Sequence, residues 1–312
     1  MDQVTLENEF LRVVIVPKYG AKITEIWDKR ANYQWLWTDP SRKLRERKFG
    51  DSYESHDISG FDDCFPNIGI SRYPLDPSLM LPDHGDLWTQ VATWHASQTS
   101  CTTIIEGVSF NYFFERTLNL KSNSLEIKYV VKNMDKRDFI GFWSAHPLFK
   151  AVDGMQIEMT GNPRMTKEFG FSGRMGRDGS DGYEGHLDAY RWPLTKGAEG
   201  SINDISFIDL AKSLTDKVVI ASPSDGKIML KNPKFGCSIC FHFDPIEIPY
   251  TGICYNLNAW PFAGEPGCWL AIEPTQGATD KLDESREVEA FLPFPSESKV
   301  EFGLRLEFQV EI

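Results

Sequence analysis

The sequence predicts an all-β protein, a large antiparallel β-sandwich with very little helix. Apolar and polar residues alternate along much of the chain, turn signals such as "SPSDGK" and "KNPKFG" separate the apolar stretches, and helical periodicity is nearly absent. A period of two places successive side chains on opposite faces of a strand, as half-buried antiparallel strands require. Many short strands without crossover helices favour a sandwich over an α/β fold.

The stretch "SKVEFGLRLEFQVEI", near the end of the chain, shows the alternation most clearly. Its apolar residues share one face: Val300, Phe302, Leu304, Leu306, Phe308 and Val310. Further strands are expected in segments such as "LRVVIVP", "AKITEIWD", "LWTQVATW" (residues 87–94) and "CWLAIEPT". Only "DLAKSLTDK", residues 209–217, has the composition of a short helix of about two turns.

Length, composition and charge narrow the class of protein. Of the 312 residues 41% are hydrophobic, and no Pro/Ser-rich linker divides them, so residues 1–312 are expected to form a single domain. A net charge of −12 argues against binding to nucleic acid or to an anionic membrane. No apolar run reaches the ~20 residues of a spanning helix. The amino terminus lacks a signal pattern, so a cytoplasmic location is expected, while the oligomeric state is left open.

The six cysteines are scattered through the chain, unlike the framework of a small disulfide-rich domain. Cys237 and Cys240 form a CxxC pair, but they lie in the strand-like segment "CSICFHFD", where residues three apart point to opposite faces. No second CxxC and no paired-histidine motif follows. Free, buried thiols are therefore favoured over a metal site, and neither a metal nor a cofactor is predicted.

Two segments depart from the strand pattern. The basic stretch "SRKLRERKFG", residues 41–50, is either a solvated loop or an anion site for a phosphorylated or acidic substrate. In residues 170–185 glycine recurs at every third position. This tract does not stand between a strand and a helix, so a surface loop near a binding cleft is favoured over a dinucleotide-binding motif.

Three stretches place titratable groups among aromatic residues at expected strand ends. They are residues 60–88, with "GFDDCFPNIG" and "LPDHGDLW", "WSAHPLF" and "WLAIEPTQGATD". In an extended strand Glu273 faces away from Ile272, and His146 shares the face of Phe142 and Ser144.

A proline follows each of these two residues and is expected to end the strand pairing. A strand-terminal carboxylate and a strand-terminal imidazole suit paired proton transfer. Taken singly, Glu273 has a plainer interpretation as a surface residue, and His146 as a satisfied core histidine.

Taken in order, the motifs resemble the aldose 1-epimerase (galactose mutarotase-like) superfamily. "NEFLRVVIVPKYGAKITEIWDK" is similar to its opening hairpin, "LPDHGDLW" to its first histidine motif and "FERTLNLKSNSLEIKYVVKNMDKRDF" to its central hairpin. "SAHPLF" resembles the second histidine motif, in the His-Pro form of the branch resembling hexose-6-phosphate mutarotases, and "WLAIEPTQGATD" the Glu-Pro motif. The resemblance runs from near residue 8 to near residue 310 and implies a galactose mutarotase-like supersandwich.

The resemblance also implies roles for individual residues. Glu273 would be the general base on the anomeric hydroxyl, His146 the general acid on the ring oxygen, and His84 a hydrogen-bond partner of the sugar near that oxygen. Arg72 resembles the family's substrate-binding arginine and Asp244 its sugar-binding aspartate.

Two further residues complete the expected substrate-binding set. Asp63 stands at an expected substrate contact, in a stretch that the galactose enzymes lack. Trp260 is either a platform for a sugar face or a core residue.

The implied reaction is the interconversion of the α and β anomers of an aldose, or of a modified aldose, by acid-base ring opening. A carboxylate and an imidazolium flanking the anomeric carbon would each keep the other charged. The partner expected is thus a small carbohydrate. Two alternatives stay open: a catalytically silent carbohydrate-binding protein on the same fold, and a glycosidase that pairs Glu273 with Asp63 or Asp83.

Overall fold

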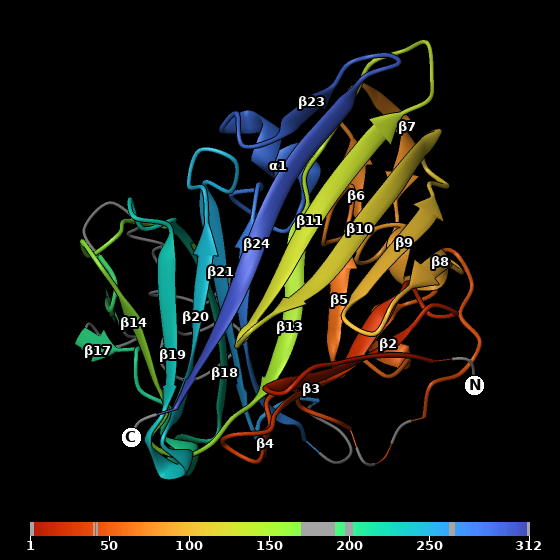
Figure 1. Cartoon of the computed structure of the whole chain (residues 1–312). Coiled ribbons are helices and arrows are strands. Elements are labelled where there is room, and N and C mark those ends of the chain that lie inside the picture. Colours follow the sequence, from red (N-terminus) through yellow and green to blue (C-terminus); the bar gives the residue numbers. More distant parts are fainter. Residues whose placement is uncertain are drawn as a thin grey trace.

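The computed structural model describes residues 3–39, 41, 43–169, 191–196, 202–261 and 266–310. Within these residues the strands form two large antiparallel sheets that lie one in front of the other (Figure 1). The single α-helix of the described residues is α1 (Leu282–Glu287). The predicted all-β sandwich is confirmed.

The first sheet has ten strands and carries the residues of interest for function. In spatial order its main path is β1 (Val4–Glu7), β2 (Leu11–Val16), β3 (Lys22–Asp28), β5 (Phe61–Cys64), β13 (Ser144–Lys150), β22 (Cys268–Thr275), β21 (Tyr250–Leu257), β18 (Leu214–Ala221) and β15 (Met165–Phe169). The tenth strand, β4 (Tyr33–Gln34), pairs with β3.

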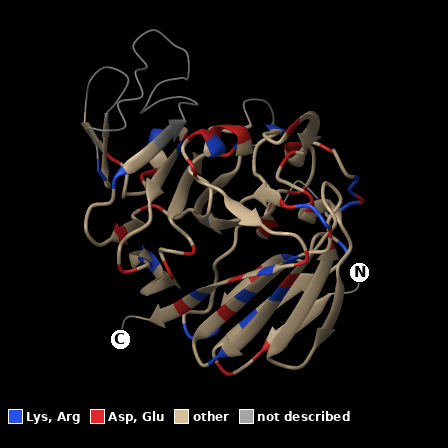
Figure 2. Ribbon diagram, turned by 90° about the horizontal axis from the view of Figure 1, so that it is seen from above, with Lys and Arg blue, Asp and Glu red and all other residues tan. Residues whose placement is uncertain are grey.

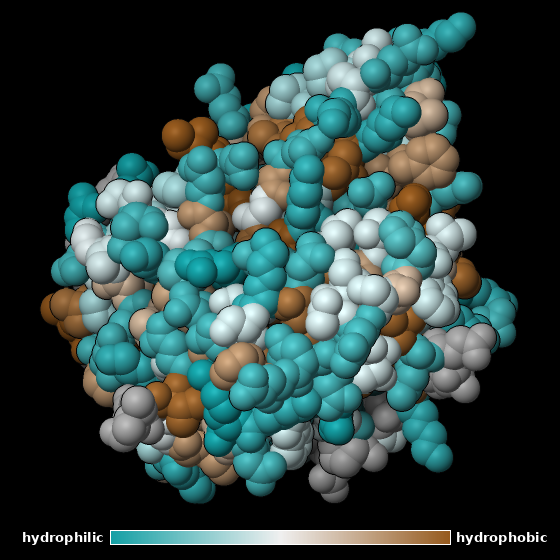
Figure 3. Space-filling view, in the orientation of Figure 1, coloured by the Kyte–Doolittle hydropathy of each residue, from teal (hydrophilic) through white to brown (hydrophobic). Residues whose placement is uncertain are grey.

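The second sheet has eight strands and forms the outer layer. Its order is β14 (Gln156–Met159), β19 (Lys227–Asn232), β20 (Cys237–Phe243), β24 (Lys299–Val310), β11 (Ser124–Asn133), β10 (Tyr112–Lys121), β9 (Ser100–Glu106) and β8 (Thr93–Ala96). Basic and acidic residues recur along its strands (Figure 2), and its solvent face is mainly hydrophilic, with apolar residues scattered over it (Figure 3). On β10, β11 and β24 the period-two pattern therefore places one face toward the core and the other toward water, as predicted.

The described residues also form three two-stranded sheets and several short 3₁₀ helices. Three two-stranded sheets pair β6 (Ser71–Tyr73) with β7 (Asp76–Leu81), β12 (Phe139–Gly141) with β23 (Leu292–Phe294), and β16 (Leu194–Lys196) with β17 (Ile202–Asp204). The 3₁₀ helices described are η1 (Tyr53–Ser55), η2 (Leu87–Thr89), η4 (Leu210–Lys212) and η5 (Pro233–Phe235). No described helix is long and apolar enough to cross a membrane.

The main hydrophobic core lies between the two large sheets, and one buried ion pair crosses it. Arg116 on β10 donates to Asp63 Oδ2 on β5 over 2.6 Å, and it also donates to the carbonyl of Ala21. The Trp143 indole donates to the other oxygen of Asp63 over 2.9 Å. Because all these groups are buried, Asp63 is part of the polar framework that joins the sheets.

The middle of the ten-stranded sheet is buried on both faces. Along β13 and β22 almost every residue is buried, whereas β24 alternates between buried and partly exposed positions. A second, smaller cluster covers the face turned away from the main core, and it contains Tyr53, Ile58, Trp88, Leu148, Trp269 and Ala271. This second face carries the candidate site.

Three local predictions were wrong, and a fourth was only partly right. Residues 209–217 form the short η4 and then enter strand β18, and residues 87–94 form η2 before the strand β8 begins. The prolines after His146 and Glu273 interrupt the pairing of β13 with β22, but they do not end the strands, since both prolines lie inside β13 and β22. Phe142 does not share the face of His146: it precedes β13 and packs in the main core.

Four of the six cysteines are buried, and so is one arginine of the basic stretch. All six cysteines are free thiols; Cys237 and Cys240 are buried on β20, while Cys254 and Cys268 are partly exposed. In the basic stretch Arg47 is buried and donates to the carbonyls of Trp88 and Asp57, each over 3.0 Å. The glycine-rich tract 170–185 lies outside the described residues.

Candidate functional site

His146 and Glu273 lie directly opposite each other on neighbouring strands. The register pairs Ser144 with Thr275 and Leu148 with Ala271, which sets His146 across from Glu273. Between those pairs the β13–β22 ladder is interrupted, since the prolines that follow His146 and Glu273 have no N–H to donate. His146 Nε2 and Glu273 Oε1 are 3.7 Å apart, at the place where the two strands are not paired.

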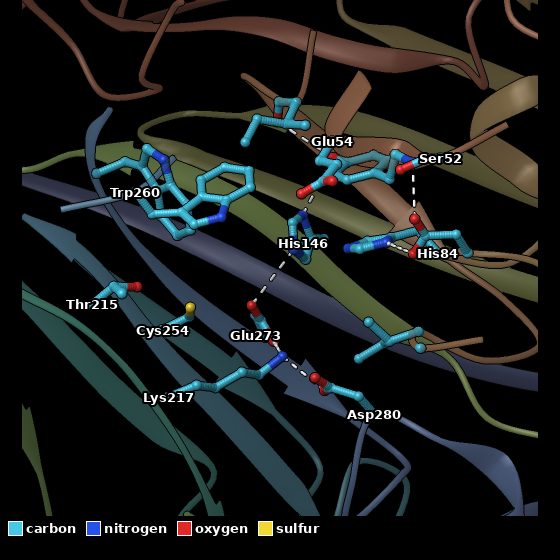
Figure 4. Close-up of a pocket in the computed structure, with 16 residues that line it drawn as sticks. Ser52, Glu54, His84, His146, Thr215, Lys217, Cys254, Trp260, Glu273 and Asp280 are labelled. Carbon is cyan, nitrogen blue, oxygen red and sulfur yellow. Dashed lines mark hydrogen bonds and ion pairs between the residues drawn. The ribbon is translucent and has the colours of Figure 1, made fainter. Parts of the chain in front are cut away.

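A cavity of about 430 Å³ opens above this pair, within the range of ~300–1,000 Å³ typical of small-molecule sites. The side chains of His146 and Glu273 point toward each other in it (Figure 4). Its other described walls include Tyr53, Ile58, Asp83, His84, Thr215, Lys217, Cys254, Trp260, Trp269 and Asp280. The structure therefore brings His146, Glu273, His84 and Trp260, all predicted site residues, to one cavity.

Lys217 on β18 supplies the positive charge next to Glu273. Its Nζ lies 2.9 Å from Glu273 Oε2 and 2.7 Å from Asp280 Oδ1 (Figure 4). Burial lowers the pKa of Lys217, but the carboxylates of Asp280 and Glu273 outweigh burial and leave the pKa raised. Lys217 is therefore an ammonium ion at neutral pH. Glu273 Oε1 is buried and accepts no hydrogen bond from the described residues.

Gly252 makes room for this carboxylate. It pairs with Glu273 between β21 and β22, and a Cβ on residue 252 would lie 2.7 Å from Glu273 Oε2. Any larger residue would push the carboxylate out of its place beside Lys217.

A second buried chain of polar groups holds His146 from the other side. The Tyr53 hydroxyl donates to Asp62 Oδ2 over 2.7 Å and lies 3.5 Å from His146 Nδ1. Lys22 Nζ lies 2.5 Å from the same Asp62 oxygen and donates to the carbonyl of Ser59. Burial raises the pKa of Asp62, but the charges of Lys22 and Arg47 outweigh burial and leave the pKa lowered.

Because Asp62 is an ionised acceptor, the Tyr53 hydroxyl proton is directed to it. The Tyr53 oxygen can then accept from His146 Nδ1, which leaves Nε2 facing Glu273.

His84 forms one side of the cavity through an unusual backbone conformation. Its φ of +56° is left-handed, and the following Gly85 is also left-handed at +71°. Gly85 permits close packing, because a Cβ there would lie 2.2 Å from the Phe65 carbonyl oxygen. The His84 ring stacks on the Tyr53 ring with 3.9 Å between the ring centroids, and His84 Nδ1 lies 2.8 Å from Asp83 Oδ1. Gly85 is thus needed for close packing, and His84 supplies an imidazole to the side of the cavity.

The expected charge of His146 is wrong. Burial, His84 and Lys217 together lower the pKa of His146 well below its ordinary value, so the ring is neutral near pH 7. The cation in contact with Glu273 is Lys217 rather than an imidazolium.

Three predicted substrate-binding residues are not brought to this cavity. Asp63 points into the core between the sheets, where burial raises its pKa and Arg116 opposes that rise. Arg72 on β6 is exposed and donates to the Pro77 carbonyl over 3.4 Å, and Asp244 stands in an exposed turn after β20. None of the three is among the described residues that line the cavity.

Sequence reasoning missed Lys217, Asp280, Tyr53 and Asp62. Lys217 stands in "TDKVVIA", where a charged residue directly before an apolar run was the only signal. Asp280 closes the Glu-Pro segment, and Asp62 stands beside Asp63 in "FDDC". A lysine buried in a strand is rare without a partner, so Lys217 could have been noticed on that ground.

Neither a protein-family model nor a curated protein matches this sequence. Solved structures do match it over the whole chain. The galactose mutarotase related enzyme from Lactobacillus acidophilus has a TM-score of 0.70 at 16% identity, and the alignment covers 100% of both chains. A galactose mutarotase-like protein from Lactobacillus casei has a TM-score of 0.67 at 18% identity, covering 99% of this chain and 100% of the other. The chain has the galactose mutarotase-like fold.

A galactose mutarotase-like protein from Clostridium acetobutylicum agrees, with a TM-score of 0.67 at 14% identity, covering 99% of this chain and 95% of the other. The galactose mutarotase-like fold that the ordered motifs implied is therefore confirmed. At these identities the likeness establishes the fold, and the chemistry has to be argued from the cavity itself.

Proposed function

We propose that this protein interconverts the α and β anomers of an aldose, or of a modified aldose, by ring opening. The observation that carries the proposal is the His146–Glu273 pair, opposed across two strands at the floor of one cavity. Glu273 Oε1 is buried without a hydrogen-bond donor among the described residues, so a substrate hydroxyl would satisfy it.

The reaction needs one proton acceptor and one proton donor. Glu273 Oε1 takes the proton of the anomeric hydroxyl while the bond from the anomeric carbon to the ring oxygen breaks and an aldehyde forms. His146 acts in its charged form, which is the minor form near pH 7, and gives its Nε2 proton to the ring oxygen. The aldehyde carbon then rotates, the ring closes on its other face, and the two protons return to their starting groups.

The geometry suits this sequence of steps. The anomeric and ring oxygens are bonded to the same carbon, so two adjacent side chains can contact one oxygen each. His146 Nε2 and Glu273 Oε1, 3.7 Å apart, are neighbours of this kind. Trp260 and Trp269, which line the cavity, supply flat apolar surfaces for a sugar face. Each proton-transfer group is expected to contribute ~10²–10⁴-fold to the rate.

Of the two alternatives, the glycosidase has less support. Asp63 is engaged by Arg116 and Trp143 in the core. Asp83 lines the cavity, but one of its oxygens is bonded to His84 and the other to the Tyr53 amide. Both carboxylates are therefore held by donors of the protein itself, which gives the glycosidase less support. The cytoplasmic location stays a prediction of the sequence.

Saturation-transfer NMR on a panel of free and phosphorylated aldoses tests the proposal. The wild-type protein should accelerate anomer exchange of at least one aldose, and Glu273→Gln and His146→Asn should each reduce that rate by ~10²-fold or more. Sugar binding without faster exchange would instead identify a carbohydrate-binding protein. Release of a reducing end from an oligosaccharide would identify a glycosidase.

A further inference from the structure

We propose that Lys217 is a positioning residue that supplies the counter-charge of the buried Glu273 carboxylate and holds its Oε1 toward the cavity, and that Asp280 fixes the Lys217 ammonium in place for this contact. The inference rests on the proposed role of Glu273 as the base. It assigns functions to two residues outside the acid-base pair, on strand β18 and on the segment that follows β22.

The need for a cation follows from burial. Glu273 is 1% exposed and Lys217 is 5% exposed. A buried carboxylate without a counter-charge takes up a proton, and it is then no longer a base. The contact of 2.9 Å between Lys217 Nζ and Glu273 Oε2 supplies that charge.

No other described group in contact with Glu273 supplies it. The titratable groups that face this carboxylate from the surrounding strands and segment are His146, Cys254, Cys64 and Asp280. Burial lowers the pKa of His146 and raises the pKa of both thiols, so these three groups are neutral near pH 7. Asp280 carries a negative charge.

The same contact determines the orientation of the base. Since Lys217 binds Oε2 and Gly252 leaves space behind that oxygen, Oε1 is the oxygen turned toward His146. A carboxylate without this anchor would be free to rotate, and a misplaced base of this kind costs ~10²-fold in rate for a displacement of about 1 Å.

Asp280 holds the other side of the ammonium. Its Oδ1 lies 2.7 Å from Lys217 Nζ, and its backbone carbonyl accepts hydrogen bonds from the amides of Ile68 and Gly69, which fix the segment in place. Lys217 is thus held between two carboxylates, and its place beside Glu273 Oε2 depends on both contacts.

The test combines a crystal structure of Lys217→Met with its anomer-exchange kinetics. Without the anchor, the 3.7 Å separation between His146 Nε2 and Glu273 Oε1 should increase by about 1 Å or more, and kcat should fall by ~10²-fold. The matched control is Lys231→Met, which removes a lysine from a 2.7 Å contact with Glu158 on the outer sheet and should change neither quantity. An unmoved Glu273 carboxylate in Lys217→Met, or a kcat within about twofold of wild type, would overturn the proposal.

The kinetics supply a second readout that a purely structural role would not move. The loss in Lys217→Met should fall on kcat, with KM within about twofold of wild type, and Asp280→Asn should show the same split with a smaller loss. If Lys217→Met does not fold, Lys217→Arg replaces it: the larger guanidinium should displace Oε2, so kcat should fall while KM is retained. A loss confined to KM in that variant would contradict the proposal.

Failure of the proposed function gives a different pattern. A wild-type protein without anomer exchange, but with the expected displacement of the Glu273 carboxylate in Lys217→Met, would retain the positioning role of Lys217 and remove the proposed reaction. Anomer exchange in which Lys217→Met changes neither kcat nor the Glu273 carboxylate would retain the reaction and remove this inference.

Discussion

Asp62 and Asp63 are neighbours in the chain, yet their carboxylates lie on opposite faces of the ten-stranded sheet. Asp62 accepts a hydrogen bond from Tyr53, behind His146, whereas Asp63 is held by Arg116 of the facing sheet. This follows from the pleat of β5, in which successive side chains alternate. The pair "DD" therefore serves two purposes, one at the cavity and one in the core.

Asp63→Ala is expected to lower the free energy of unfolding by about 3–5 kcal/mol, because it leaves the Arg116 guanidinium buried without its counter-charge. Urea denaturation followed by tryptophan fluorescence measures the loss. Glu106→Ala, at an exposed position of β9, is the control and should change stability by less than about 0.5 kcal/mol. A similarly small effect in Asp63→Ala would show that the ion pair between the sheets contributes little to the free energy of unfolding.

Gly252→Ala is expected to lower kcat/KM for anomer exchange by ~10²-fold, since the new Cβ displaces the Glu273 carboxylate. Gly303→Ala is the matched control: Gly303 is also a strand glycine, and a Cβ there would meet only the Ile127 carbonyl oxygen at 3.4 Å. Anomer exchange should be unaffected by that control. Equal activity in Gly252→Ala and wild type would argue against Glu273 as the base.

The pH dependence of anomer exchange should report the acid. Because the pKa of His146 lies well below its ordinary value, the protonated fraction falls about tenfold for each unit of pH above it. The logarithm of kcat/KM should therefore decline with a slope near −1 across roughly pH 7 to 8.5. His146→Asn should lose this slope together with most of the rate. A flat wild-type profile over that interval would assign the acid to another group.

The same lowered pKa has a consequence for stability. The unfolded chain takes up a proton on His146 below about pH 6.5, whereas the folded chain does so only at lower pH. Wild-type protein should thus lose stability relative to His146→Asn as the pH falls from about 6.5, by up to ~1.4 kcal/mol per unit. Denaturant midpoints at a series of pH values measure this. Parallel curves for the two proteins would mean that burial does not disfavour the charged ring.

Arg72→Ala and Asp244→Ala are expected to leave kcat/KM within about twofold of wild type, because both residues are exposed and neither is among the described residues that line the cavity. His84→Ala is the positive comparison: its ring lines the cavity, and its removal should raise KM. A large loss on replacing Arg72 or Asp244 would mean that the substrate extends well beyond the cavity.

Local pattern was enough to predict the class of fold and part of the site. The period of two identified the strands, because side-chain alternation is a property of each strand alone. The order of motifs joined His84, His146 and Glu273, and these three line one cavity together with Trp260, which was named separately as an aromatic residue. For β24 the pattern even gave the buried face correctly, since one side of that strand meets water.

What only the tertiary structure decided is which strands stand side by side, and on which face of a doubly buried sheet a polar group falls. Lys217 meets Glu273 because β18 and β22 both flank β21 in the sheet, although β18 and β22 are far apart in the chain. Asp63 was misplaced because both faces of β5 are buried, so hydrophobic alternation carries no information there. Short-range periodicity records the direction of a side chain, whereas its partner and its charge depend on non-local pairing and burial.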